Sequence, residues 1–164
     1  AADNMTLKSS ALSCLLRAGK GQAELAAFYD EWKSDRLVID KWFMLQVLHA
    51  DPDSAAEVAE ALTQHQDFYW KNPNRFRAVL GGLASHHAGF HAADGKGYTL
   101  LADWLIRLDP VNPQTTARMC TPFQTWRRYD TARQELIGTE LDRILAQPDL
   151  SRDTTEMIQR IRAA

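Results

Sequence analysis

Apolar residues recur at helical spacing along nearly the whole chain, and no segment shows the two-residue alternation that is typical of a strand. The strongest candidate for a strand, Leu37–Ile39, runs directly into a helical pattern. The periodicity therefore predicts an all-α fold of about nine helices without a sheet. The expected helices are residues 4–17, 22–33, 37–49, 53–64, 73–84, 97–108, 113–127, 131–146 and 152–162.

Turn and cap residues separate these helices. Asp53 or Ser54 is expected to cap the fourth helix, and Glu57 completes a capping box with Ser54. Caps of the last two helices are expected at Asp130 and at Ser151 or Asp153. Breaks between helices are expected at Gly19–Gly21, Asp51–Asp53, Asp94–Gly97 and Asp109–Pro110.

One capping pattern occurs twice, at Asn72-Pro73 and again at Asn112-Pro113. In both, Asn suits the cap position and Pro suits the first helical position. The separation of about 40 residues is typical of two-helix and three-helix repeats. It predicts an armadillo-like or HEAT-like superhelical stack of antiparallel helix pairs, forming a single domain over residues 1–164. Helices one repeat apart would then run parallel, with their N-termini on the same side.

The bulk composition excludes several classes of protein. A net charge of -2 does not fit the basic surface of a nucleic-acid-binding domain. No apolar run approaches the ~20 residues that span a bilayer, and no signal peptide precedes the first helix, so a cytoplasmic location is expected. The chain begins at Ala1 without an initiator Met. We therefore expect a piece of a longer chain, although a processed protein would begin in the same way.

The two cysteines, Cys14 and Cys120, lie on helical patterns among apolar neighbours. Free cysteine often behaves as a small buried hydrophobe, so both are expected to be free and buried. The alternative is a single disulfide in an exported protein.

The sequence holds no complete catalytic motif. Gly81-Gly82 lacks the following Lys and Ser/Thr of a phosphate-binding loop, and close helix packing explains it better. Aromatic residues at helical spacing favour a core over a ligand site. These aromatic residues are Phe28, Tyr29, Trp32, Trp42 and Phe43.

His87 and His91 stand at the spacing with which two histidines on one helix face bind zinc. A zinc peptidase requires Glu directly after the first of them, and Ala88 occupies that position. No third ligand follows. We expect no metal and no catalytic residue in this chain, with the histidines bonded to backbone at a helix end. A small metalloprotein that uses His86, His87 and His91 is the alternative.

Arg77, Gln114 and Arg118 are the candidate binding residues. Gln114 and Arg118 share a helix face because they are four residues apart. If the two Asn-Pro helices run parallel, Arg77 lies near them and the three side chains form a positive patch near two helix N-termini. Such a patch could receive a carboxylate or a peptide backbone. The alternative is that each arginine pairs with a local acid on the surface.

Several strings, in order and spacing, resemble the C-terminal domain of bacterial aminopeptidase N, a zinc-dependent enzyme of the gluzincin type. The resemblance extends from Asp3 to the last helix. The strings are Ala2–Thr6, Leu37–Phe43, Asn72–Arg77, Phe90–Tyr98, Asn112–Gln114 and Arg128–Asp130.

The resemblance implies a helical superhelix that packs on a catalytic domain of the same parent chain. It implies a parent that removes N-terminal amino acids from peptides, with zinc and the general base in an absent upstream domain. It further implies that this domain encloses the active-site cavity and controls the entry of peptide substrate. Arg77, Gln114 and Arg118 match positions that face this cavity, on the side of the residues after the scissile bond. This fragment alone is expected to be inactive.

The chain departs from its relatives at Ala84–His87 and at Met119–Pro122. Pro122 is expected to kink or break a helix that is continuous in them. The rival hypothesis for the whole chain is a free-standing helical-repeat scaffold that binds a protein partner.

Overall fold

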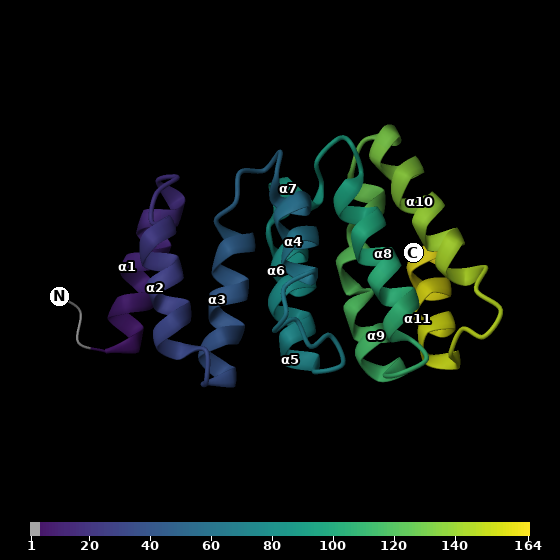
Figure 1. The fold of residues 1–164 in the computed structure, drawn as a ribbon. Helices are drawn as coiled ribbons and strands as arrows, with labels where there is room; N and C mark the ends of the chain where they lie inside the picture. Colours follow the sequence, from purple (N-terminus) through teal and green to yellow (C-terminus); the bar gives the residue numbers. More distant parts are fainter. Residues whose placement is uncertain (1–3) are drawn as a thin grey trace.

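The computed structural model describes residues 4–164, and every regular element in that range is a helix. Ala2 and Asp3 of the first resemblance string lie outside these residues. The helices stand side by side in a row that runs from the N-terminal to the C-terminal end (Figure 1). The predicted all-α stack of antiparallel helix pairs is therefore confirmed.

Contacts between helices divide the stack into two layers. One layer contains α1 (Met5–Arg17), α3 (Arg36–Leu48), the run of α5 (Pro73–Phe76), π-helix η1 (Arg77–Gly81) and α6 (Gly82–Ser85), and then α9 (Pro113–Met119) and α11 (Arg152–Ala163). The other contains α2 (Gln22–Trp32), α4 (Ala55–Thr63), α8 (Lys96–Leu108) and α10 (Thr131–Leu145). The short α7 (His87–Phe90) and the 3-10 helix η2 (Thr121–Arg128) connect them.

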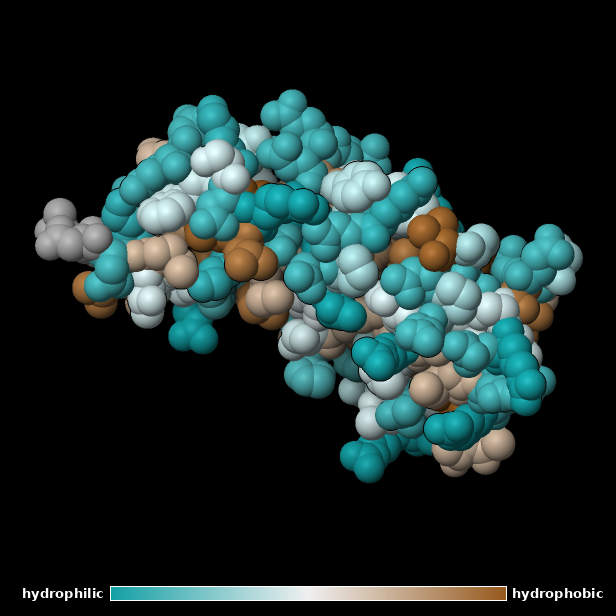
Figure 2. Space-filling view, turned by 90° about the horizontal axis from the view of Figure 1, so that it is seen from below, coloured by the Kyte–Doolittle hydropathy of each residue, from teal (hydrophilic) through white to brown (hydrophobic). Residues whose placement is uncertain are grey.

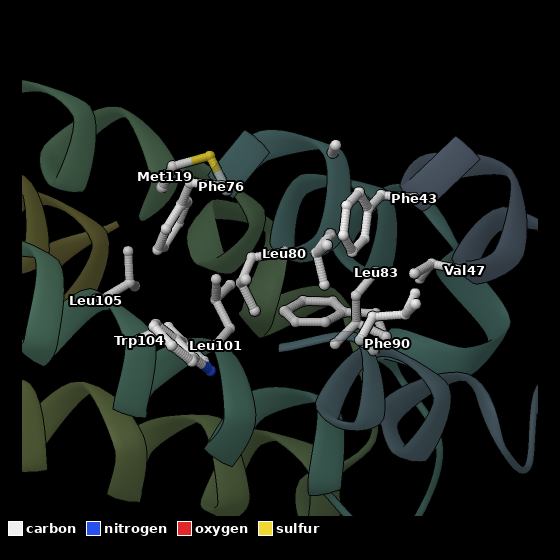
Figure 3. Close-up of a cluster of buried hydrophobic side chains, with 14 of the residues drawn as sticks. Phe43, Val47, Phe76, Leu80, Leu83, Phe90, Leu101, Trp104, Leu105 and Met119 are labelled. Carbon is white, nitrogen blue, oxygen red and sulfur yellow. The ribbon is translucent and has the colours of Figure 1, made fainter. Parts of the chain in front are cut away.

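The core lies between the layers and around the run α5–η1–α6. Leu80 and Leu83 of this run lie between Phe43 of α3 and Leu101 of α8 (Figure 3). Of the predicted aromatic core residues, Phe28, Trp42 and Phe43 are buried, and Tyr29 and Trp32 are partly buried against the same core. The prediction of a core, and not a ligand site, holds for this group.

Both predicted Asn caps are confirmed. The side-chain oxygen of Asn72 accepts a hydrogen bond from the backbone N–H of Asn74 at 2.9 Å, and that of Asn112 from Thr115 at 3.0 Å. Each cap satisfies an N–H group that has no partner inside its helix. The predicted caps Asp130 and Ser151 are confirmed in the same way.

The predicted capping box at the fourth helix is wrong. Ser54 stands at the predicted N-cap position, but its hydroxyl donates to the Asp51 carbonyl at 3.3 Å and forms no side-chain cap hydrogen bond. Glu57 instead forms an ion pair of 2.6 Å with Lys96 of α8. Glu57 therefore pairs with a side chain of another helix and not with the N-terminus of its own helix.

The single helix predicted at 113–127 is also wrong. The α-helix ends at Met119, and the chain continues as the 3-10 helix η2. Pro122 has no N–H group, so it cannot donate to the carbonyl of Arg118 four residues earlier. The break expected at Pro122 is confirmed. The helix predicted at 73–84 is continuous to Ser85 but contains the π-helical turn η1, which the sequence pattern did not indicate.

The two cysteines differ in environment. Both are free, but Cys14 is exposed, so the prediction that it is buried is wrong. Leu12 is the only buried residue of α1, which packs against α2 and α3. Burial raises the pKa of the Cys120 thiol to about 12. None of the described helices is long and apolar enough to cross a bilayer.

A buried carboxylate joins α8 to the start of α11. Asp109 is 2% exposed and accepts hydrogen bonds from the Ser151 backbone N–H at 2.7 Å, the Ser151 hydroxyl at 2.6 Å and the Thr154 hydroxyl at 2.5 Å. A buried charge needs this degree of hydrogen bonding to be tolerated. The contact fixes the last helix on the stack.

Asp109→Ala should lower the free energy of unfolding by about 3 kcal/mol, because it leaves the buried Thr154 hydroxyl and the half-buried hydroxyl and N–H of Ser151 without their acceptor. Urea unfolding of this chain measures the change. Asp149→Ala is the matched control, since Asp149 is exposed in the loop before α11, and it should change the value by less than about 0.5 kcal/mol. Equal effects of the two variants would refute a structural role for Asp109.

Candidate functional site

The two Asn-Pro helices begin at the same end of the molecule. Figure 1 shows α5 and α9 at its lower end, and the chain rises from each of them through η1 and η2. Met119 of α9 lies beside Phe76 of the central run (Figure 3). The parallel arrangement predicted for these helices is therefore present. Figure 2 views the molecule from this end, which is mostly hydrophilic with small, separate hydrophobic areas.

Arg77 is the first residue of η1, and its side chain is exposed while the next three residues are buried. Its guanidinium donates to the side-chain oxygen of Asn74 at 3.3 Å. No carboxylate of residues 4–164 lies within ion-pair distance of it. The alternative in which Arg77 pairs with a local acid is thus not found there.

Gln114 and Arg118 are both exposed on α9, on the face opposite the buried Thr116. Within the part of the chain that the structure describes, Arg118 also has no carboxylate partner. Two cations without acidic partners and one amide are available for hydrogen bonds to an acceptor-rich ligand. The site therefore suits a carboxylate or the carbonyl groups of a peptide.

The position of Gly81 shows that Arg77 lies on the side of η1 next to α9. A Cβ atom built on Gly81 would lie 3.5 Å from the Cβ of Arg77 and 3.8 Å from the terminal methyl carbon of Met119. Arg77 thus lies on the side of η1 that faces α9, and Arg118 directly precedes Met119. We refer to Arg77, Gln114 and Arg118 together as the basic surface. Its proposed role in binding stays a prediction.

The sequence analysis did not identify the structural role of Arg75, which is buried whereas Arg77 is exposed. Arg75, two residues earlier, is buried and pairs with Asp40 of α3 at 2.5 Å. It also donates to the backbone carbonyls of Asp67 and Arg36. The helical offset between Arg75 and Arg77 could have indicated that they point to different faces. Arg75 therefore anchors the run from α5 to α6, while Arg77 stays exposed and has no carboxylate partner among residues 4–164.

The histidines near α7 have structural partners. His86 accepts from the Gly89 N–H at 3.0 Å, and its other ring nitrogen bonds the Ala50 carbonyl at 2.9 Å. His91 bonds the Tyr98 hydroxyl at 2.8 Å. The backbone bonding predicted for His87 and His91 is wrong for His91, whose buried ring bonds a side-chain hydroxyl instead. His87 stacks on His91 at 6.4 Å between ring centroids.

These residues do not fit a zinc centre. In residues 4–164, no group of three or more His, Cys, Asp or Glu side chains is placed to hold a metal ion. Tyr98 engages one ring nitrogen of His91, and the Tyr129 ring stacks on the same imidazole at 3.9 Å. Burial, with the nearby charges of His87 and Arg133, lowers the pKa of His91 to about 4.

Comparison with known proteins agrees with the architecture. Residues 1–163 match the family described as "Domain of unknown function (DUF3458_C) ARM repeats". The chain is 40% identical over 160 residues to aminopeptidase N of Caulobacter vibrioides and 40% over 162 residues to aminopeptidase N of Haemophilus influenzae. These alignments cover 96% and 97% of this chain and 18% of each relative.

A solved structure has the same fold. The aminopeptidase A of Legionella pneumophila, crystallised in complex with aspartic acid, matches with a TM-score of 0.89 and 33% identity. The match covers 98% of this chain and 19% of that one.

The two-layered helices and the family match define an ARM-repeat domain. The chain belongs to the DUF3458_C family, and it corresponds to the C-terminal region of bacterial aminopeptidase N. The family resemblance predicted from the sequence strings is confirmed. The chain spans about a fifth of the length of these relatives, at 18%.

The stability of the fold should fall between about pH 6.5 and pH 4. An unfolded His91 takes up a proton near pH 6.5, whereas the folded one does so only near pH 4. The unfolded state therefore gains protons first as the pH falls, and the loss is on the order of 2 kcal/mol. Urea unfolding at several pH values measures this slope.

His91→Gln should reduce that slope, because glutamine does not titrate. His87→Ala is the control: His87 is exposed, so its removal should leave most of the slope in place. If His91→Gln and the unchanged chain showed the same pH dependence, His91 would not be the group responsible.

Proposed function

We propose that this chain is the C-terminal helical domain of a zinc metallo-aminopeptidase that removes N-terminal amino acids from peptides. The observation that carries the proposal is the identity of about two residues in five with aminopeptidase N over nearly the whole chain. The small share of each relative that is covered leaves room for a catalytic domain elsewhere in the parent chain. The aspartic acid bound by the Legionella relative is of the product class that an aminopeptidase releases.

In this proposal, the domain encloses the active-site cavity and controls the access and position of peptide substrate. The support is the basic surface, which offers two guanidinium groups without a carboxylate partner among the described residues and one amide, from two helices that begin at the same end of the stack. A guanidinium presents several N–H donors in a fixed plane, which suits peptide carbonyls and carboxylates. Holding a peptide in one position can raise the rate as well as the affinity.

The chemistry of bond cleavage belongs to the absent part of the parent. Zinc, when bound there, would polarise the peptide carbonyl and activate water. The residues of this chain bind and orient the peptide, and they supply neither a metal ligand nor a general base in this proposal. A cytoplasmic location likewise stays a prediction.

The upstream reading frame tests the proposal against the free-standing scaffold. A segment encoding His-Glu-x-x-His upstream of Ala1 supports the aminopeptidase domain. A start codon close to Ala1, with no such segment, would favour a scaffold protein that binds a partner.

Arg118→Ala in the full-length parent should lower kcat/KM for a tripeptide about tenfold, which equals about 1.4 kcal/mol of lost transition-state stabilisation. The free energy of unfolding should change by less than about 0.5 kcal/mol, because Arg118 is exposed and unpaired. Steady-state kinetics and thermal unfolding measure the two effects.

Arg17→Ala is the matched control, since Arg17 is an exposed arginine at the C-terminal end of α1, whereas the basic surface lies near the N-terminal ends of α5 and α9. It should leave the kinetics unchanged. An aminoacyl p-nitroanilide provides a second control, because it has no residue after the scissile bond for Arg118 to hold. Unchanged kinetics of Arg118→Ala on peptides of several lengths would contradict a substrate role.

A further inference from the structure

The π-helical turn η1 begins at Arg77, which is a residue of the basic surface. π-helices are rare, occur mostly as single turns inside α-helices, and are frequently found at functional sites. Here the turn extends from Arg77 to Gly81 inside an otherwise α-helical run. Its position coincides with a residue selected independently from the sequence.

Packing holds this turn in place. Ala78, Val79 and Leu80 are at most 1% exposed, and η1 contacts both α3 and α4. Just before the turn, the buried Arg75–Asp40 ion pair fixes the helix to α3. Three of its four side chains are in the core, so the turn leaves Arg77 as its one exposed side chain.

The turn places residue 81 directly over the stem of Arg77. In an α-helix, Cβ atoms four residues apart are about 5–6 Å apart. A Cβ on Gly81 would lie only 3.5 Å from the Cβ of Arg77. A single methyl group fits there at ordinary van der Waals distance, but a larger side chain would press on the arginine stem or on Met119, 3.8 Å away.

One further contact defines the course of the Arg77 side chain. Asn74 accepts a hydrogen bond from its guanidinium at 3.3 Å. Asn74 is itself exposed at the start of α5, so this contact contributes little to the core. The Arg77 side chain thus has Gly81 beside its aliphatic part and Asn74 next to its guanidinium.

We propose that η1 positions Arg77 for the peptide, with Gly81 as the residue that keeps the space beside its stem open and Asn74 as the acceptor that orients its guanidinium. This inference rests on the proposed function of the basic surface. Gly81 and Asn74 are positioning residues, because they act through Arg77 and not on the substrate.

The experiment is a double-mutant cycle in the full-length parent enzyme, with a tripeptide and an aminoacyl p-nitroanilide as substrates. Gly81→Val should lower kcat/KM for the tripeptide about tenfold, while Gly81→Ala, whose methyl group fits, should stay within about twofold of the parent. In an Arg77→Ala background, Gly81→Val should have no further effect beyond about twofold. The anilide should be hydrolysed normally by all of these variants.

Asn74→Ala is a second variant that leaves the core untouched, should Gly81→Val fail to fold. It should raise KM for the tripeptide with little change in kcat, because the guanidinium of Arg77 loses the acceptor that orients it. Thermal unfolding establishes that each variant is folded before kinetics are compared.

The outcomes distinguish a failure of the proposed function of the basic surface from a failure of the positioning role of Gly81 and Asn74. If Arg77→Ala leaves tripeptide kinetics unchanged, the proposed function of the basic surface fails. If Arg77→Ala lowers activity but Gly81→Val and Asn74→Ala do not, only the positioning role is overturned. If Gly81→Val lowers tripeptide activity equally in the parent and in the Arg77→Ala background, it acts on the fold and not through Arg77.

Discussion

Burial of the central run Pro73–Ser85 is the constraint on which the rest of the structure depends. This run packs against α3, α4 and α8, so that most of its circumference lies in the core. Leu80 and Leu83 are fully buried, and so is Phe76 near its start. One narrow exposed stripe remains, and it carries Arg77. The location of the basic surface thus follows from how the core is filled.

Two arginines in this run show how burial assigns different roles to one residue type. A buried guanidinium is stable only with a carboxylate and further acceptors around it, and Arg75 has Asp40 and two backbone carbonyls. Arg77 lies on the solvent side with only an amide oxygen as partner, so its charge remains available for a ligand. In the proposed enzyme, one arginine holds the helix and the other holds the peptide.

Local chemistry could be predicted where it depends on adjacent residues. The caps at Asn72 and Asn112 need only a side-chain oxygen and nearby N–H groups, and both formed as expected. Predictions failed where a partner from another repeat intervened. Glu57 forms an ion pair with Lys96 of α8 instead of the predicted capping box. Cys14 is exposed because α1 packs against α2 and α3 with only Leu12 buried.

By itself, the sequence determined the helical class, the repeat spacing and the resemblance to aminopeptidase N, since periodicity, caps and short strings are local properties of the chain. Only the tertiary structure decided the π-helical turn at Arg77. The residues from Arg77 to Gly81 have an ordinary helical pattern, and their turn is held by side chains of α3 and α4 far away in sequence. Packing between repeats therefore sets the space beside the Arg77 stem, which no local pattern encodes.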